Sequence, residues 1–569
     1  QQDWLAGQTI LMLEPRRMAA RAAASRMARL LGERVGETVG YRIRLDTCIS
    51  AQTRIEVITE GILTRRLQGD PGLDGVGLVI FDEFHERSLD SDLCLALSLQ
   101  GRDMFREGPP LKLLVMSATL DGDAVATLLG GATVITSHGR QFPVQSHLTG
   151  THKLQSPLAP IVAQAVLRAL REQAGNVLVF LPGQREISAV GRELAQQLQQ
   201  AGTTNILLAP LYGGLSLERQ QQAIELPPAG KRKVVLSTNV AETSLTIEGI
   251  GAVVDSGLVR EARFDPVTGM TRLATRRVSL AAAEQRQGRA GRLGPGHCYR
   301  TWSTEQHGRL VSHSSPEILQ ADLAPLALQL RAWGVADPAE LSWLDTPPKA
   351  AWQQGLSVLQ QCGAVFCNSS GVFQLTPHGV RLAQMPLHPR LAHMLMVACD
   401  IHATETGCLL AAVLSERNPV SEGGVDLSFT LGVLMGEHRC ASSLQGWFKR
   451  SWQQARRYAR IATEVHKPRG FALQVDQQNV LGVLLASAYP DRVARRRDNG
   501  GSYQLANGRS ATLPQDDALA RNEWLAVADT GGQQVSAVDN IFSAASLDPA
   551  CFKEVLSPLV REEELVEWD

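Results

Sequence analysis

Features that mark many membrane and extracellular proteins are missing from this sequence. No apolar stretch approaches the ~20 residues that a helix needs to cross a bilayer. The first residues, Gln1 to Trp4, have neither the basic nor the apolar part of a secretory signal. The nine cysteines are scattered, and none forms a Cys-x-x-Cys pair. We therefore expect a cytoplasmic protein with reduced thiols and no membrane partner, without a disulfide framework or zinc site.

The sequence also lacks a surplus of charge of either sign. Its 56 basic and 57 acidic residues give a formal net charge of −1. Any nucleic-acid-binding surface must therefore be local. The apolar content of 44% and charged content of 20% are those of ordinary globular proteins. A chain of 569 residues exceeds a single core, and roughly three to five domains are expected.

Strand-like and helix-like segments alternate through the first 300 residues. A helix is expected at residues 18–31, and residues 137–143 are typical of a linker. The alternation predicts the α/β class, with parallel sheets in two tandem domains at residues 1–140 and 141–310. Polar motifs follow the strands, at the edge where such sheets bind ligands. The predicted strands cover residues 8–13, 78–81, 111–116, 177–181, 233–236 and 252–254.

A different pattern begins near residue 310. Amphipathic helices are predicted at residues 319–333 and 352–361, and a hairpin at 363–375 with its turn at 368–371. Helix, helix and hairpin together predict a winged-helix module at residues 311–375. Residues beyond about 480 are richer in Gly, Asn and Asp, which predicts a β-containing C-terminal module.

Two short segments carry the chemistry. Residues 285–292 read Gln-Arg-Gln-Gly-Arg-Ala-Gly-Arg, and such clustered guanidinium groups suit phosphate oxygens. Asp82 and Glu83 follow the apolar run 77–81, where nucleotide hydrolases hold magnesium and activate water. An isolated Asp-Glu pair is more often a helix N-terminus with favourable acids. The nearby His85, together with residues 117–119 one strand later, argues against that alternative.

These segments resemble motifs VI and II of superfamily 2 helicases, and more narrowly the DEAH-box RNA helicases of the bacterial HrpB type. The resemblance covers roughly the whole chain and is strongest to about residue 400. It implies two RecA-like domains, a helical ratchet-like domain at residues 376–480 and an HrpB-type C-terminal domain from 481 to 569. It further implies an ATP-dependent RNA helicase that uses ATP or another NTP with Mg²⁺ and has RNA as its partner. The matching segments are 14–17 (motif Ia), 59–63 (Ib), 117–119 (III), 180–183 (IV) and 237–247 (V).

The resemblance implies a nucleotide site. Asp82 would hold Mg²⁺, usually through water, and Glu83 would orient and deprotonate the attacking water. Gln285 would help to place that water. Arg289 and Arg292 would be arginine fingers that act when the two domains close, each worth roughly 10³–10⁵ in rate. The other residues implied at the nucleotide are Arg26 on the adenine, His85 as the link to motif VI, Ser244 and Thr246.

The resemblance also implies an RNA path. Arg17, Arg44, Thr59 and Thr238 would contact the RNA backbone. Residues 264–270 resemble the tip of a strand-separating hairpin, although a plain surface hairpin fits their spacing nearly as well. Two hydroxyl residues of motif III would link hydrolysis to domain movement, namely Ser117 and Thr119.

The chain departs from the family pattern at three positions. Phe84 stands where alanine is usual, and Glu248 where aspartate is usual. A phenylalanine that normally stacks on adenine has no counterpart near residues 224–226. Leu226 offers only an apolar face there, so the sequence does not define the base preference.

A phosphate-binding loop of the form Gly-x₄-Gly-Lys-Ser/Thr is absent. The only Gly-Lys dipeptide, Gly230-Lys231, has Glu225 at the first glycine position and Arg232 in place of Ser or Thr. In the family this loop precedes motif Ia, and residues 564–569 end without an obvious capping element. We therefore expect this chain to be a fragment that is truncated at both ends and inactive alone. The alternative is a non-hydrolysing nucleic-acid-binding relative that has lost the loop. The retained acids and motif VI residues favour the hydrolase, and a DNA helicase is disfavoured by resemblance alone.

Overall fold

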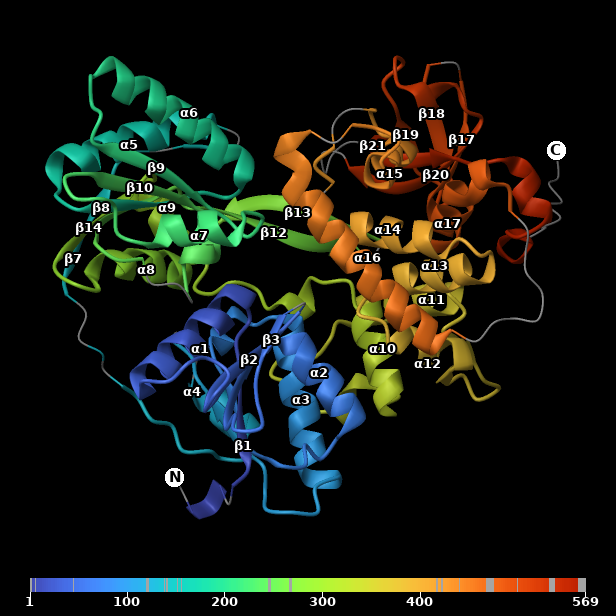
Figure 1. The fold of residues 1–569 in the computed structure, drawn as a ribbon, viewed down its shortest axis with the longest axis horizontal. Coiled ribbons are helices and arrows are strands. Elements are labelled where there is room, and N and C mark those ends of the chain that lie inside the picture. Colours follow the sequence, from blue (N-terminus) through green and yellow to red (C-terminus); the bar gives the residue numbers. More distant parts are fainter. Residues whose placement is uncertain are drawn as a thin grey trace. The chain divides into compact units, whose positions relative to one another are not determined.

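The chain forms two compact units, each described here by itself. The first unit comprises Gln1–Asp265, Thr271–Ala321 and Ala339–Pro348, and the second comprises Pro266–Met270, Asp322–Pro338 and Lys349–Asp569. Figure 1 shows the computed structural model. The structure describes residues 3–560 except 6, 45, 119–121, 138, 140–141, 151, 155, 244–246, 266–268, 416–417, 421–422, 440, 467–474, 499 and 532–537.

One sheet of the first unit, with the helices around it, is called the first lobe. Its strand order is β3-β2-β4-β1-β5-β6, and all neighbours are parallel except β2 and β3. The central strands are apolar on both faces, as parallel sheets covered by helices require. The strands are β1 Thr9–Leu13, β2 Val39–Ile43, β3 Asp46–Cys48, β4 Ile55–Ile58, β5 Val76–Phe81 and β6 Lys112–Val115; the helices are α1 Arg17–Leu31, α2 Glu60–Gly69, α3 Leu89–Met104 and α4 Gly122–Leu128.

The other sheet of this unit, with its helices, is called the second lobe. Its order is β7-β14-β11-β8-β10-β9, and all neighbouring strands are parallel. The strands are β7 Val144–Leu148, β8 Asn176–Phe180, β9 Ile206–Leu211, β10 Arg232–Ser237, β11 Ile250–Asp255 and β14 Gly296–Arg300; the helices are α5 Leu158–Glu172, α6 Gln184–Gln200, α7 Leu217–Ile224, α8 Leu280–Gly288 and α9 Thr304–Gly308.

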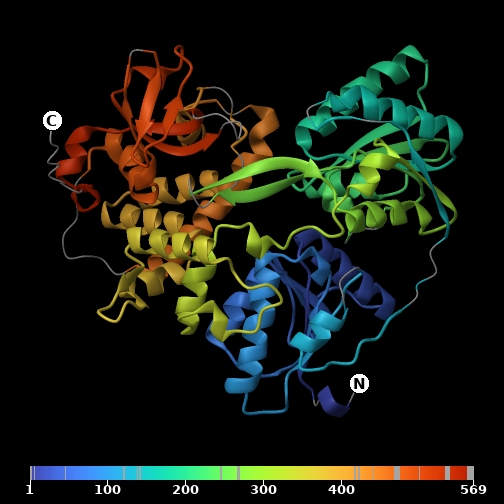
Figure 2. The same cartoon turned by 180° about the vertical axis from the view of Figure 1, so that it is seen from behind.

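The α/β class with parallel sheets is confirmed, and all six predicted strands are present. In the predicted linker, the described residues of 137–143 form no helix or strand. The segment expected as a hairpin tip lies in a two-stranded hairpin, β12 Leu258–Asp265 and β13 Met270–Arg277, although residues 266–268 are outside the described part. The hairpin is the long green ribbon in Figure 2.

The second unit opens with α10 Ala324–Trp333, α11 Lys349–Gln361 and an antiparallel hairpin of β15 Val365–Cys367 and β16 Phe373–Leu375. The Asn368 side chain forms the hairpin turn by accepting the N–H groups of Ser370 and Val372. The expected helix at 319–333 was wrong at its start. The helix begins at Ala324, and Pro325 occupies its first turn, where the missing N–H of proline costs no helical hydrogen bond.

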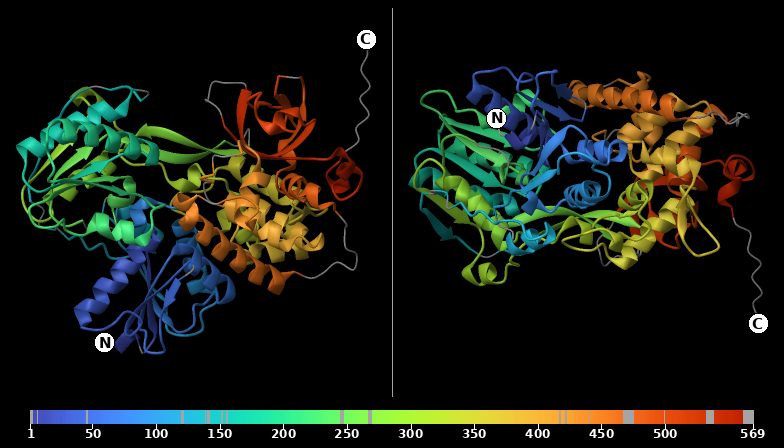
Figure 3. Two further views of the ribbon diagram at one scale, coloured as in Figure 1. Left: turned by 45° about the horizontal axis from the view of Figure 1, so that its top comes forward. Right: turned by 90° about the horizontal axis from the view of Figure 1, so that it is seen from below.

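Helices and a barrel complete the second unit. A closed five-stranded barrel has the order β17-β18-β19-β21-β20, so strands are present after residue 480 as expected (Figure 3). The winged-helix, ratchet-like and C-terminal domain boundaries remain predictions. The elements are α12 Pro377–Ala383, α13 Pro389–Asp400, α14 Thr404–Leu414, α15 Leu427–Met435, α16 Gln445–Val465, α17 Val480–Ala488, β17 Val493–Arg496, β18 Ser502–Leu505, β19 Ser510–Thr512, β20 Trp524–Gly531 and β21 Val538–Ser546.

Two expectations from composition can be compared with the structure. The eight cysteines in the described part of the chain are all free thiols, as predicted. Among the helices that the structure describes, none combines the length and the apolar character needed to span a membrane.

Candidate nucleotide and RNA site

The acidic pair lies in a strained turn at the end of β5. The Asp82 N–H donates to the Leu13 carbonyl of the neighbouring strand β1 at 3.1 Å, which fixes the start of the turn. Glu83 then adopts a left-handed backbone with φ of 51°, and its N–H donates to Asp82 Oδ1 at 2.8 Å. A left-handed residue other than glycine costs roughly 1–2 kcal/mol. Such strain often clusters at functional positions.

Three carboxyl groups meet at this edge of the sheet. Burial, followed by the charges of Asp82 and Glu86, raises the pKa of Glu83 to about 7. Glu14 follows β1, is only 4% exposed and shares a hydrogen bond with Asp82. Burial and the Asp82 charge raise the pKa of Glu14 to about 9, which keeps it protonated near neutrality. The sequence alone gives Glu14 no role, because its burial and its contact with the distant Asp82 arise only on folding.

The donor set at this edge fits a magnesium ion that takes few protein ligands. Among the described residues, no group of three His, Cys, Asp or Glu side chains is arranged to hold a metal. Asp82 nevertheless offers hard oxygen donors, and the buried Oε2 of Glu14 has no hydrogen-bond partner in the described structure. Mg²⁺ usually keeps several waters and binds one or two carboxylates together with substrate phosphates. Asp82 is therefore the residue that would hold it.

His85 connects the acidic turn to motifs III and VI. The Nδ1 of His85 accepts the Ala118 N–H at 3.3 Å. Its Nε2 lies 2.8 Å from the Gln285 amide nitrogen and 3.4 Å from a Glu83 carboxylate oxygen. Burial lowers the pKa of His85, so the ring is neutral at pH 7. This contact brings His85 of the first lobe next to Gln285 of the second, and the role of the pair in coupling remains a prediction.

A buried arginine anchors motif VI. Arg286 is 1% exposed and pairs with Glu242 at 2.7 Å and with Asp255 at 2.9 Å. Its guanidinium also lies over the Phe180 ring, 5.0 Å from the centroid. Burial opposes the charged form, but the two carboxylates raise the pKa of Arg286 above its ordinary value. The sequence alone gives this residue no role, because its partners, Asp255 at the end of β11 and Glu242 in the segment after β10, are 31 and 44 residues away.

The two predicted arginine fingers face the acidic turn. Arg289 Nε donates to the Glu242 carbonyl at 2.7 Å, and its Nη2 donates to the carbonyls of Glu242 and Thr243. Burial and the charge of Arg292 lower the pKa of Arg289 to about 9, while the Glu83 carboxylate opposes that shift. Desolvation lowers the pKa of Arg292, and Glu83 opposes the shift there as well. Both guanidinium groups therefore interact electrostatically with the predicted general base.

The predicted RNA contacts all follow strand ends. Arg17, Arg44 and Thr59 come after β1, β2 and β4, and these parallel strands end at one edge of the first sheet. Thr238 follows β10 of the second lobe. Arg17 is exposed, whereas Arg44, Thr59 and Thr238 are partly buried. Their contact with RNA remains a prediction.

The remaining predicted site residues fall into two groups. Arg26 and Ser117 are exposed, on α1 and after β6 respectively. Ser244, Thr246 and Thr119 lie outside the described residues.

Of the residues that depart from the family pattern, Phe84 is buried and the other two are exposed. Phe84 is 1% exposed and packs edge-on against Phe81, with ring centroids 6.2 Å apart, so it fills the core below the acidic turn. Leu226 is 59% exposed and Glu248 is also exposed.

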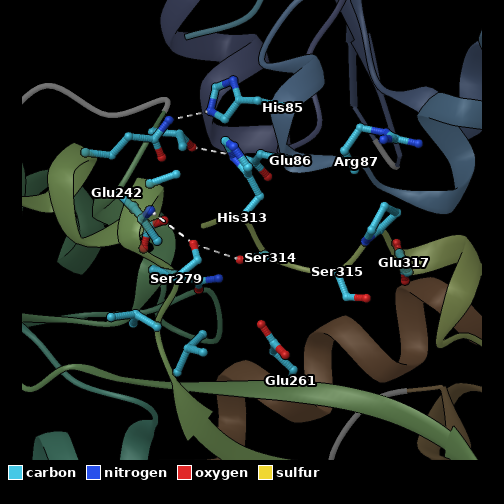
Figure 4. Close-up of a pocket in the computed structure, with 18 of the residues that line it drawn as sticks. His85, Glu86, Arg87, Glu242, Glu261, Ser279, His313, Ser314, Ser315 and Glu317 are labelled. Atoms are coloured by element: carbon cyan, nitrogen blue, oxygen red, sulfur yellow. Dashed lines mark hydrogen bonds between the residues drawn. The ribbon is translucent and has the colours of Figure 1, made fainter. Parts of the chain in front are cut away.

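A cavity of about 550 Å³ lies beside the acidic turn. Figure 4 shows His85, Glu86 and Arg87 on one side of it and Glu242 on another. The wall is completed by α8 and by residues 313–317. Neither Glu83 nor Arg289 is among its lining residues, so the cavity adjoins the predicted hydrolysis site without containing it.

The chain is similar in sequence and fold to known helicases. The profile of the helicase conserved C-terminal domain matches residues 161–294. The ATP-dependent RNA helicase HrpB of Escherichia coli strain K12 is 44% identical over 560 residues, which is 98% of this chain. This chain belongs to the HrpB-type DEAH-box helicases. It spans 65% of the length of the E. coli protein.

Solved structures of the same HrpB family match the fold. A crystal structure of the E. coli DExH-box NTPase HrpB has a TM-score of 0.81 at 43% identity, covering 99% of this chain and 66% of that one. A crystal structure of the E. coli DEAH/RHA helicase HrpB has a TM-score of 0.82 at 43% identity, covering 95% of this chain and 65% of that one. The parallel-sheet lobes are therefore those of an HrpB-type helicase.

Proposed function

We propose that the protein is an ATP-dependent RNA helicase that couples NTP hydrolysis to RNA translocation and unwinding. One observation carries the proposal: the Glu83 carboxylate of the first lobe interacts with Arg289 and Arg292 of the second. A protein that only binds nucleic acid has no need of a base and two arginine fingers assembled from separate lobes. Membership of the HrpB-type family supports the same function.

Each residue of the site has a distinct proposed task. Glu83, whose pKa is about 7, accepts the proton of the attacking water. Gln285 orients that water and is held by His85. Arg289 and Arg292 stabilise charge that develops on the transferred phosphoryl group. Bound Mg²⁺, held through Asp82, would neutralise phosphate charge.

The proposed partner is RNA, gripped at the strand ends that carry Arg17, Arg44, Thr59 and Thr238. Ser117 and Thr119 would transmit hydrolysis to lobe movement, with Ser244 and Thr246 near the nucleotide and Arg26 on the adenine. The domain assignments, with a winged-helix at 311–375, a ratchet-like domain at 376–480 and a C-terminal domain from 481, are part of the same proposal.

Strand displacement by the full-length protein tests the function. We expect it to release a labelled strand from an RNA duplex with a 3′ single-stranded overhang when ATP and Mg²⁺ are present, and not when ATP is omitted. A protein that binds this duplex tightly yet never releases the strand would be the non-hydrolysing relative instead. A DNA duplex of the same sequence serves as the control for substrate class.

Purified residues 1–569 alone are expected not to hydrolyse ATP. The printed sequence has no Gly-x₄-Gly-Lys-Ser/Thr segment, so the β- and γ-phosphates lack a backbone cradle and lysine, and Mg²⁺ lacks a hydroxyl ligand. The measurement is phosphate release with saturating RNA. Release above that of the buffer blank would show that phosphate binding does not depend on such a loop.

The rate of ATP hydrolysis by the full-length protein is expected to depend on pH. The pKa of Glu83 is raised to about 7, and a base works only when deprotonated, so kcat/KM falls as pH drops through that value. Each pH unit well below that value lowers kcat/KM about tenfold, because the deprotonated fraction of Glu83 in the free enzyme falls tenfold. Measuring kcat/KM from about pH 5.5 to 8.5 checks this. A flat profile would show that Glu83 is not the titrating base.

A further inference from the structure

Four residues form a second bridge between the lobes, close to the His85–Gln285 contact. Arg16 of the first lobe directs Nη2 to Glu86 Oε2 at 3.0 Å and donates from Nη1 to the Asn239 carbonyl of the second lobe at 2.8 Å. The Thr243 hydroxyl of the second lobe donates to Glu86 Oε1. We call this set of four residues the interlobe latch. Each carboxylate oxygen of Glu86 is bound from a different lobe.

One side of the latch touches the proposed hydrolysis site. Glu86 ends the short turn Phe84–Glu86 that follows Glu83, and its N–H donates to the Glu83 carbonyl at 2.9 Å. The Thr243 carbonyl accepts a hydrogen bond from Arg289. A shift of the latch therefore moves the backbone that carries the proposed base and the carbonyl that holds a proposed finger.

The other side of the latch adjoins the proposed RNA edge. Arg16 directly precedes Arg17, and Asn239 directly follows Thr238. Arg17 and Thr238 are the RNA contacts proposed in the first and second lobe. A single RNA strand bound to both Arg17 and Thr238 would also set the distance between Arg16 and the Asn239 carbonyl.

The side chains of the latch are largely shielded from solvent, which strengthens their interactions. The side chains of Arg16 and Glu86 are 24% and 19% exposed, and Thr243 is 7% exposed. Ion pairs at this depth are less screened than surface pairs, and hydrogen bonds to a carboxylate are stronger than neutral ones. The latch also forms part of the wall of the cavity in Figure 4, where Glu86 lies next to the open space. Room to rearrange is therefore present beside it.

We propose that Glu86 is a positioning residue that, through Arg16 and Thr243, transmits RNA binding to Glu83 and Arg289. This inference rests on the proposed function, since it names how that site is switched on. Without RNA the lobes sample spacings at which Glu86 is held by only one of them. With RNA both oxygens are held, and the turn that carries Glu83 is fixed in its working position.

The test compares steady-state ATP hydrolysis by full-length variants with and without single-stranded RNA. Glu86→Gln and Thr243→Val each remove one part of the latch, and the double variant removes both. Thr243→Ser keeps the hydroxyl. Glu56→Gln is the matched control, because Glu56 pairs with Arg42 at 2.6 Å and Arg66 at 3.3 Å on the first lobe alone.

We expect RNA-stimulated kcat to fall about tenfold in Glu86→Gln and in Thr243→Val. At about pH 8.5, where Glu83 is deprotonated with or without the neighbouring Glu86 charge, the RNA-free rate, the KM for ATP and the nucleotide-free RNA affinity stay within about twofold, because neither substitution removes a proposed ligand contact. The double variant is no worse than either single variant, since both remove one coupling. Thr243→Ser and Glu56→Gln keep the stimulation of the unmodified protein.

Other outcomes overturn the proposal. Equal losses of the RNA-free and RNA-stimulated rates would make the latch a structural support only. Additive losses in the double variant, or stimulation unchanged in both single variants, would show that Glu86 and Thr243 do not act together. If the unmodified protein hydrolyses ATP but RNA never stimulates it, the proposed function itself fails, and the latch fails with it.

Discussion

Replacing Glu83 by glutamine in the full-length protein is expected to abolish ATP turnover and to leave ATP binding intact. The amide keeps the size and shape of the carboxylate but cannot accept a proton, and the loss of a general base costs about 10²–10⁴-fold in rate. The strained turn around Glu83 is held by hydrogen bonds from main-chain N–H groups, one of which goes to the Asp82 carboxylate, and the substitution changes none of these groups. Binding is measured by titration with a fluorescent ATP analogue, and turnover by phosphate release.

The control for this variant is Glu37→Gln, which changes an exposed carboxylate of the same lobe. It should bind and hydrolyse ATP as the unmodified protein does. A near-normal rate in Glu83→Gln would refute the assignment of the base. A loss of ATP binding together with turnover would place Glu83 among the groups that hold the nucleotide.

Arg17→Ala and Arg292→Ala in the full-length protein are expected to have opposite effects on RNA binding and catalysis. Removing a phosphate contact at Arg17 weakens RNA binding for all sequences and lowers the slope of log affinity against log salt by about one. Removing the finger at Arg292 slows hydrolysis roughly 10³–10⁵-fold and leaves nucleotide-free RNA affinity nearly unchanged. A salt titration of RNA binding, run beside ATPase rates, measures both effects.

The two variants control for each other, since each removes one arginine. If Arg292→Ala changes the salt slope while Arg17→Ala does not, the roles are reversed and the motif register is wrong. If both change the slope, the motif VI arginines belong to the RNA surface.

The sequence predicted the strands that are rich in branched aliphatic residues and missed others. β5 and β8 are nearly continuous runs of Val, Ile, Leu and Phe, which is the signature of a parallel strand buried on both faces. β2 reads Val-Gly-Tyr-Arg-Ile and β14 reads Gly-His-Cys-Tyr-Arg. Because these two strands contain polar residues and glycines, their sequences lack the pattern of a buried strand. They belong to the sheets because they pair with neighbouring strands.

Candidate site residues could be predicted where a short pattern in the sequence indicates them. Asp82 and Glu83 belong to one such pattern, and the motif VI arginines belong to another. The contacts around these residues join segments that are far apart in the sequence, since Arg16 is 70 residues from Glu86 and 223 from Asn239. Arg286 and Glu14 were missed for the same reason, because burial and distant partners give them their roles. Contacts between residues that are far apart in the sequence form only on folding, so a short segment of sequence does not predict them.

Steady-state ATP hydrolysis by the full-length protein, titrated with single-stranded RNA, tests the central claim most directly. The account predicts a low rate without RNA, a rise to a plateau as RNA is added, and no rise in the Glu83→Gln variant that binds the same RNA. If the unmodified protein binds RNA yet hydrolyses no ATP at any RNA concentration, the two lobes form a nucleic-acid-binding scaffold and the helicase assignment is contradicted.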